Sequence, residues 1–226
     1  MTPASPVGER STVLALLLLT FATGMVDAVS VLVLGHVFVA NMTGNVIFLG
    51  FWFVPDSGID MTAAVVAFAG FLAGTVVGGR MVRHIPDDRR RLTIALGSEV
   101  VALLILSLLA GAGVLDYRDD RKLVLIAGMA VVFGAQNVTA RQFGIPELTT
   151  TVLTSTIVGI GYDSRLAGGD GRREKLRYGV VLTMCGGAVL GATVTRVTVA
   201  PVIAAAAVVI AAAAMVFRYG PRPTTQ

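Results

Sequence analysis

The chain has 226 residues, of which 55% are hydrophobic and only 14% are charged, whereas a soluble domain carries about 25% charged residues. The net charge of +4 does not indicate a nucleic-acid partner, because most cations lie in two short loops between apolar runs. The single cysteine, Cys185, excludes a disulfide framework, and no zinc-type cluster of cysteine and histidine is present. We therefore expect a multi-pass, all-α membrane protein whose partner is the lipid bilayer, with no metal site and no cofactor.

Eight apolar segments follow one another along the chain. A bilayer core about 30 Å thick needs roughly 20 apolar residues per helix, and most of the segments approach or exceed that length. They cover Thr12–Leu34, Phe38–Val54, Met61–Val82, Leu92–Leu115, Leu123–Ala140, Leu148–Tyr162, Tyr178–Arg196 and Thr198–Phe217. We expect them to form one membrane domain, residues 1–226.

The second and sixth segments, residues 38–54 and 148–162, are short and polar in their first halves. The second contains Asn41, Thr43 and Asn45, and the sixth contains five threonines and a serine. The two segments occupy matching places in an internal repeat. Phe21–Asp27 aligns with Val131–Asn137, Ala40–Asn45 aligns with Thr151–Thr156, and Gly70-x-x-x-Gly74 aligns with Gly187-x-x-x-Gly191. The sequence therefore predicts two repeats, residues 12–115 and 123–217.

Charge constrains how these repeats cross the membrane. The loops Arg80–Arg91 and Asp163–Arg177 are both rich in arginine, and such loops stay in the cytoplasm. Eight full spans would place these two loops on opposite sides. Six full spans with two half-membrane or re-entrant segments place both loops and both termini inside, and make the repeats inverted. The alternative is that both short segments are ordinary tightly packed helices.

Inverted repeats with interrupted polar segments at matching positions are typical of transport sites. Asp27 is the strongest single signal, because a carboxylate within an apolar span needs a partner, a proton or a cavity. It is either a proton or cation site, helped by Asn41, Asn45 and His36, or one member of a structural hydrogen bond. The residues expected to line the solute site are Asp27, Asn41, Thr43, Asn45, Asn137, Thr151 and Thr154.

Glu99 also lies within an apolar run, where it is a candidate second acidic site or a side chain that extends to the membrane surface. Arg141 is expected to extend to the cytoplasmic surface, with binding of an anionic group as the alternative. Glycines at four-residue spacing let helix backbones approach closely. The expected packing residues are Gly70, Gly74, Gly78, Gly187 and Gly191.

No nucleophile lies near a base in a recognisable pattern, so we expect no enzyme. An intramembrane enzyme would need Asp27 and Glu99 to meet at one depth. The first hypothesis is a small secondary transporter or permease for a small polar solute or ion, which could act as a homodimer. The rival is a non-transport membrane protein, such as an assembly partner or sensor.

Two stretches resemble a known family. Phe21-Ala-Thr-Gly-Met-Val-Asp27, followed by Ala40-Asn-Met-Thr-Gly-Asn45, resembles the opening motif of the bacterial YoaK family, catalogued as the DUF1275 domain. Gly134-Ala-Gln-Asn137 and Thr151–Thr156 resemble its second motif, so the similarity extends over about residues 12 to 217. The resemblance implies a bacterial inner-membrane protein and leaves substrate and mechanism open.

Overall fold

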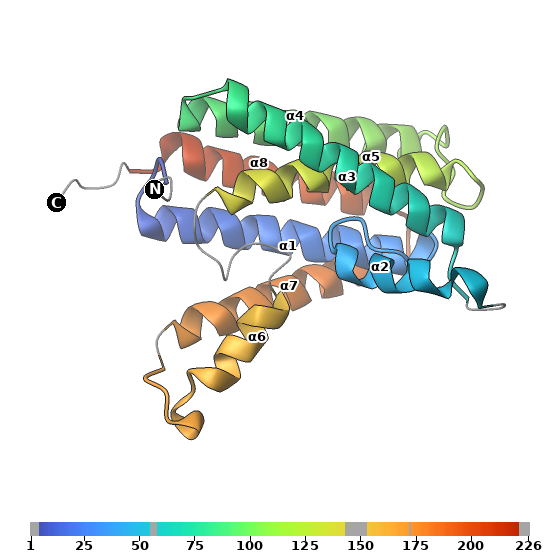
Figure 1. Cartoon of the computed structure of the whole chain (residues 1–226). Coiled ribbons are helices and arrows are strands. Elements are labelled where there is room, and N and C mark those ends of the chain that lie inside the picture. The colour runs from blue at the N-terminus through green and yellow to red at the C-terminus, as the bar shows by residue number, and fades with distance from the viewer. Residues whose placement is uncertain (1–4, 55–57, 143–152, 172, 222–226) are drawn as a thin grey trace.

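The computed structural model describes residues 5–54, 58–142, 153–171 and 173–221. This part of the chain is helical and contains six long apolar helices, each long enough to cross a membrane (Figure 1). They are α1 (Glu9–Val33), α3 (Met61–His84), α4 (Asp88–Gly111), α5 (Lys122–Arg141), α7 (Glu174–Thr195) and α8 (Ala200–Tyr219). Two shorter helices, α2 (Met42–Gly50) and α6 (Leu153–Tyr162), follow α1 and α5, with single 3-10 turns at Phe51–Phe53 and Arg165–Ala167. The all-α fold and the six expected spans are thus confirmed.

Two aspartates fix where α3 and α4 begin. The carboxylate of Asp60 accepts a hydrogen bond from the Ala63 N–H at 3.0 Å, and that of Asp87 accepts one from the Arg90 N–H at 2.6 Å. Both side chains satisfy backbone donors that have no partner within the first turn of a helix. The cap at Asp87 explains why α4 starts four residues before the apolar run at Leu92.

One end of the bundle holds both ends of the described chain. The Gly8 N–H donates to the Pro221 carbonyl oxygen at 2.8 Å. The Arg89 guanidinium donates to the carbonyl oxygens of Pro6 and Gly220 at 3.3 and 3.0 Å. These contacts join the starts of α1 and α4 to the end of α8. We call this the basic end, because it also holds Arg83, His84, Arg90, Arg141 and Lys175.

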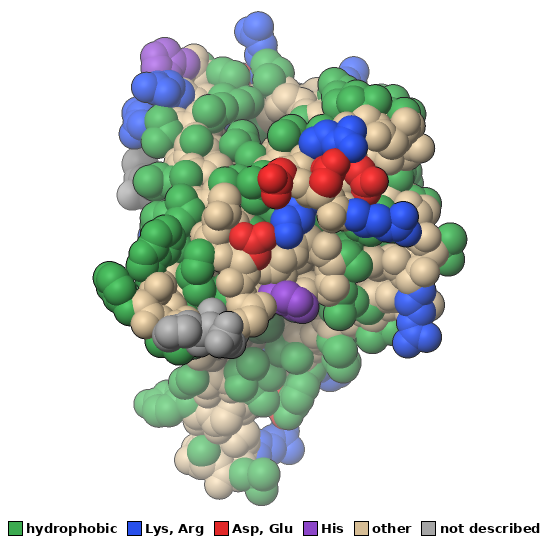
Figure 2. Space-filling model, turned by 90° about the vertical axis from the view of Figure 1, so that its right-hand side faces the viewer, with side chains coloured by type: hydrophobic (Ala, Val, Ile, Leu, Met, Phe, Trp, Pro, Cys, Tyr) green, Lys and Arg blue, Asp and Glu red, His purple; other side chains and the backbone are tan. Residues whose placement is uncertain are grey.

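The opposite end joins the remaining helix termini. Lys122 Nζ lies 2.7 Å from Asp60 Oδ2, linking the starts of α3 and α5. Ser107 Oγ donates to the Ala200 carbonyl oxygen at 2.7 Å, linking the end of α4 to the start of α8. Figure 2 looks onto this end, where acidic and basic side chains gather between apolar ones. We call it the mixed-charge end.

Each short helix begins and ends on one side of the bundle. The chain leaves α1 at the mixed-charge end, passes through α2, and starts α3 at that same end beside Lys122. α5 runs parallel to α3, and α7 runs parallel to α1 (Figure 1). The end of α5 and the start of α7, between which α6 lies in the sequence, are therefore both at the basic end. At 9 and 10 residues, the two helices are about 14 to 15 Å long, half of a bilayer core. This agrees with six full spans and two short segments.

Glycines determine how the parallel pairs cross. On α7, a Cβ added at Gly187 would overlap the Phe21 carbonyl oxygen of α1, and one at Gly191 would lie 2.5 Å from that of Met25. On α3, a Cβ at Gly74 would overlap the Val131 carbonyl oxygen of α5. Glycine at these positions therefore allows the backbones to touch.

The two crossings match each other contact by contact. Phe21 aligns with Val131 and Met25 with Ala135, and the Ala135 carbonyl oxygen lies 2.9 Å from a Cβ added at Gly78. The contacts thus match Gly74 with Gly187 and Gly78 with Gly191. This register differs by one helical turn from the predicted pairing of Gly70 with Gly187. A glycine every fourth residue aligns equally well in either register, and only the facing carbonyls distinguish them.

Candidate functional site

Asp27 holds the chain segment that leads into α2. Its Oδ1 accepts hydrogen bonds from the backbone N–H groups of Val39 and Ala40, both at 2.9 Å. Its Oδ2 accepts one from the Asn41 side-chain amide at 2.5 Å. Asp27 lies six residues before the end of α1, roughly 9 Å along the helix axis. Residues 34–40 therefore turn back along α1 into the bundle before α2 begins.

Asn45 closes this turn from the other side. Its amide nitrogen donates to the Phe38 carbonyl oxygen at 2.6 Å, and its amide oxygen accepts the Phe38 N–H at 2.8 Å. The side chain is fully buried, the one buried residue of α2. Non-helical backbone at membrane depth is tolerated only where the protein satisfies its polar groups. Asp27, Asn41 and Asn45 provide that here, and we call these three residues the amide cluster.

The charge of Asp27 suits its place at the start of α2. The unpaired N–H groups of a helix N-terminus carry a partial positive charge, which favours an anion nearby. Asn41 is the N-cap residue of α2, and its amide contacts the Asp27 carboxylate. A structural hydrogen bond is the alternative role that the sequence allows for Asp27, and the structure contains three such bonds.

An apolar pocket of about 340 Å³ lies beside the amide cluster, between α1 and α7. Asp27 contributes to its wall, but both carboxylate oxygens are occupied by the bonds to the turn. The other lining residues are Gly24, Ala28, Val31, Leu32, Phe38, Met184, Ala188 and Ala192. A surface of this composition accommodates an aliphatic group rather than a polar solute.

The remaining predicted solute-site residues lie elsewhere. Thr43 on α2 and Thr154 on α6 are exposed, and Thr151 lies outside the described residues. Asn137 is four residues from the end of α5 at the basic end and donates to the Phe133 carbonyl oxygen at 3.0 Å. Counted from the mixed-charge end, Asp27 is six residues along α1 and Asn137 is fifteen residues along α5, so their depths differ by roughly 13 Å. The structure gathers the residues of the first repeat into one cluster and leaves Asn137 in the other half.

Thr156 of α6 is not among the predicted solute-site residues, yet its side chain is buried. It is 1% exposed and is the one buried residue of α6, as Asn45 is of α2. The alignment of Ala40–Asn45 with Thr151–Thr156 pairs these two residues. The pairing with Asn45 is the sequence signal that could have identified Thr156 as a buried residue.

A second polar group lies between α4 and α5. Gln136 Nε2 donates to Glu99 Oε2 at 3.0 Å, and the side chains are 1% and 3% exposed. Glu99 therefore points into the bundle and does not extend to the membrane surface. Asp27 and Glu99 belong to separate hydrogen-bonded groups, so the structure does not bring together the pair that an intramembrane enzyme would need.

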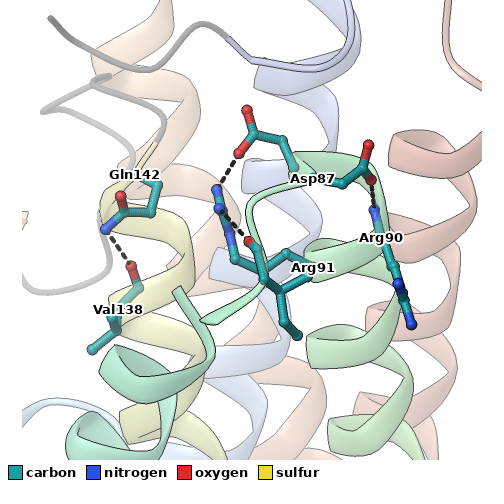
Figure 3. A network of polar contacts seen from close by, with 7 residues as sticks. Asp87, Arg90, Arg91, Val138 and Gln142 are labelled. Atoms are coloured by element: carbon teal, nitrogen blue, oxygen red, sulfur yellow. Dashed lines mark hydrogen bonds and ion pairs between the residues drawn. The ribbon is translucent and has the colours of Figure 1, made fainter. Parts of the chain in front are cut away.

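The start of α4 at the basic end carries a third group (Figure 3). Arg91 pairs with Asp88 and donates to the Ile85 carbonyl oxygen at 3.2 Å. On α5, the Gln142 side-chain amide donates to the Val138 carbonyl oxygen at 3.5 Å. Arg141 is exposed, as expected of a side chain that extends to the surface. Within the described residues, acidic, histidine and cysteine side chains form no group of three that could hold a metal ion.

The comparisons with known proteins agree with the membrane fold. The sequence profile of the family "Protein of unknown function (DUF1275)" matches residues 15–216. The UPF0700 transmembrane protein YoaK of Bacillus subtilis (strain 168) is 33% identical over 154 residues, which are 67% of this chain. The chain spans 65% of that relative's length. No solved structure matches. The chain therefore belongs to the DUF1275 family and, like its relative YoaK, is a transmembrane protein.

Proposed function

We propose that this protein is a small secondary transporter or permease for a small polar solute or ion. The observation that carries the proposal is the pair of short polar helices, α2 and α6, which lie toward opposite ends of the bundle without crossing it. In secondary transporters, discontinuous helices at matching positions of inverted repeats form the substrate site near the middle of the membrane.

The packing supports two inverted repeats, residues 12–115 and 123–217. In the two repeats, α1 corresponds to α5 and α3 corresponds to α7. The contact between α1 and α7 therefore has a counterpart between α5 and α3, and both contacts are present. Within them, the contact of Gly187 with Phe21 corresponds to the contact of Gly74 with Val131. Because each repeat has three long helices, an odd number, the second repeat enters the membrane from the side opposite to the first.

The orientation follows from charge. The basic end carries the arginines and lysine near residues 80–91, 141 and 173–177, and it also holds both ends of the described chain. Loops rich in Lys and Arg stay in the cytoplasm. The basic end is thus cytoplasmic in a bacterial inner membrane, with the N- and C-termini inside, and α2 lies toward the outer side.

The two halves differ at the residue that would hold each short helix. Asp27 accepts three hydrogen bonds from the turn before α2, and its counterpart in the second repeat is the uncharged Asn137. Figure 1 shows α6 and the first half of α7 diverging from the other helices. In an alternating-access cycle, one repeat rocks against the other. In such a cycle the amide cluster would keep the turn before α2 fixed on α1, while α6 would move together with the first half of α7.

One observation favours the rival, a non-transport membrane protein. Asp27 and Asn45 are fully occupied by hydrogen bonds within the chain, as structural polar residues would be. The exposed apolar face of α7, which includes Leu182, Val189 and Leu190, could then pack on another protein or on a second copy of this chain. The rival requires that no solute crosses the membrane through this protein.

Reconstitution separates the two functions. Small polar solutes and ions are first tested for thermal stabilisation of the purified protein, and those that stabilise it are then tested for uptake into proteoliposomes. The transporter hypothesis predicts saturable uptake. The uptake rate should fall more than about tenfold (about 1.4 kcal/mol) in Asn41→Ala. It should be unchanged in Val46→Ala, at an exposed site on α2. Uptake no faster than in protein-free vesicles, for every solute, would contradict it.

A further inference from the structure

Two buried oxygen atoms in the α4–α5 contact have no hydrogen-bond partner among the described residues. They are Oε1 of Glu99 and Oε1 of Gln136. The other polar atoms of the two side chains meet each other, since Gln136 Nε2 donates to Glu99 Oε2 at 3.0 Å. A buried acceptor without a partner is costly, and an uncompensated buried carboxylate is more so.

We propose that Glu99 and Gln136 form a proton-binding site in which Glu99 carries a proton on Oε1 and donates it to Gln136 Oε1. One proton then satisfies both unpartnered oxygens. A neutral carboxyl group and a carboxamide form two hydrogen bonds in this arrangement, N–H to oxygen and O–H to oxygen. The bond from Nε2 to Oε2 is the half of this pair that the structure already contains.

The surroundings of the pair are apolar. One turn away from Glu99 on α4 lie the buried side chains of Ala95, Leu96 and Leu103. On α5, Phe133 and Ala140 are buried one turn away from Gln136, and the Thr139 hydroxyl donates to the Ala135 carbonyl oxygen at 3.1 Å. No second charge is therefore at hand in these two helices to stabilise an ionised Glu99.

Charged side chains on the helices around the pair lie near the helix ends, with one exception. The exception is Asp27 of α1, which is bonded to the turn before α2. The others are Glu9 and Arg10 on α1, Arg80, Arg83 and His84 on α3, Asp88 to Arg91 on α4, Lys122 and Arg141 on α5, and Arg218 on α8. Glu99 is thus the one ionisable side chain in the middle of the layer formed by α3, α4, α5 and α8.

A proton fits this site better than a metal cation does. Hard cations such as Ca²⁺ take about 6 to 8 oxygen ligands, and the pair offers two free oxygens. Glu99 lies eleven residues after the start of α4, roughly 16 Å from the basic end. The site is therefore near mid-depth, where a bound proton can pass to either side if the α4–α5 contact opens to water. That coupling step rests on the proposed transport function; the bound proton itself does not.

Infrared spectroscopy of the full chain in lipid nanodiscs tests the proton. At pH 7 the protein should show the C=O stretching band of a protonated carboxyl group. The band should be absent in Glu99→Gln, retained in Asp27→Asn, and shifted to higher frequency in Gln136→Met, which removes the amide. Val101→Ala, a lipid-facing site on the same helix, is the control and should leave the band in place.

Three results would overturn the site: no such band at pH 7, a band removed by Asp27→Asn instead, or a band removed by adding Na⁺ at constant pH. Coupling is measured separately, as uptake driven by a pH gradient in proteoliposomes. Loss of that uptake in Glu99→Gln with the band assigned to Glu99 supports both proposals. Absence of uptake in every protein, with the band present, contradicts the transport function and leaves the proton site standing.

Discussion

Asn45 and Phe38 form a reciprocal pair, in which the side-chain amide of Asn45 binds both the N–H and the carbonyl oxygen of Phe38 at 2.8 and 2.6 Å. These two bonds satisfy the Phe38 backbone as a neighbouring strand would, in a segment that is neither helix nor strand. It is what allows an irregular turn to lie inside a helical membrane protein.

Replacement of Asn45 by alanine should destabilise the protein strongly. The change leaves two part-buried backbone groups of Phe38 without partners, at a cost of up to about 1–3 kcal/mol for each. Thermal unfolding of the purified protein measures the loss. Val46→Ala, on the exposed face of the same helix, is the matched control, and equal effects of the two changes would contradict the role given to Asn45.

Asp27 should tolerate asparagine better than leucine. Asparagine retains an oxygen that can accept the N–H groups of Val39 and Ala40, and the Asn41 amide can rotate to present its own oxygen to the new NH₂ group. Leucine leaves all three donors unpaired, which should cost several times about 1 kcal/mol. The melting temperatures of the two variants test this difference.

Proton-driven uptake that is lost in Asp27→Asn but kept in Glu99→Gln would place coupling at Asp27, as the sequence first suggested.

Much of this architecture could be predicted from the sequence, since length and hydropathy fix where an apolar helix can cross a bilayer. The apolar runs give the six spans to within a few residues, and the arginine-rich loops favour the two short segments. The exact start of α4 depends on the capping carboxylate of Asp87, which lies outside the apolar run.

The composition of the site was harder to predict, because it depends on which groups meet in space. Asp27, Asn41 and Asn45 come together because the turn folds back by six residues along α1. Asn137 has a matching sequence position, but inversion of the second repeat puts it in the other half of the bundle. Glu99 and Gln136 are 37 residues apart in the sequence, and no local sequence pattern predicts that they pair.

The glycine crossings predict a position-dependent response to one added methyl group. Gly187→Ala places a Cβ on the Phe21 carbonyl oxygen and forces α1 and α7 apart, whereas Gly179→Ala on the same helix meets nothing within 4 Å. We expect the first change to destabilise the protein by about 1–3 kcal/mol or more and the second to be nearly neutral. Yield and melting temperature in detergent compare them directly. Gly74→Ala should behave like Gly187→Ala if the two crossings are equivalent.

The ion pair at the mixed-charge end predicts a pH effect. Partial burial raises the pKa of Asp60, but the hydrogen bond and charge of Lys122 and the Ala63 N–H outweigh it and bring the pKa below its ordinary value. An acid with a lowered folded-state pKa stabilises the fold above its unfolded pKa of about 4, and this contribution is lost as the pH falls through the lower folded value.

Lys122→Met should therefore lower stability at neutral pH by up to about 1 kcal/mol, as is usual for a partly exposed pair. The difference from the unmodified protein should shrink as the pH falls below about 4. Thermal unfolding across this pH range measures both effects. A difference that grows on acidification would have the wrong sign for this pair.

The central claim is that α2 and α6 are short segments that do not cross the membrane, and the side on which each loop lies tests it most directly. With Cys185 replaced by alanine, single cysteines are placed by Pro86→Cys, Leu166→Cys and Arg118→Cys, all at exposed positions. An impermeant thiol reagent is then applied to intact cells and to permeabilised cells. Six spans predict labelling of Arg118→Cys in intact cells and labelling of Pro86→Cys and Leu166→Cys only after permeabilisation. Labelling of Pro86→Cys and Leu166→Cys from opposite sides would mean that α6 crosses the membrane. Labelling of both in intact cells, with Arg118→Cys labelled only after permeabilisation, is the pattern expected if α2 crosses and the N-terminus stays inside. Either result would contradict the six-span topology.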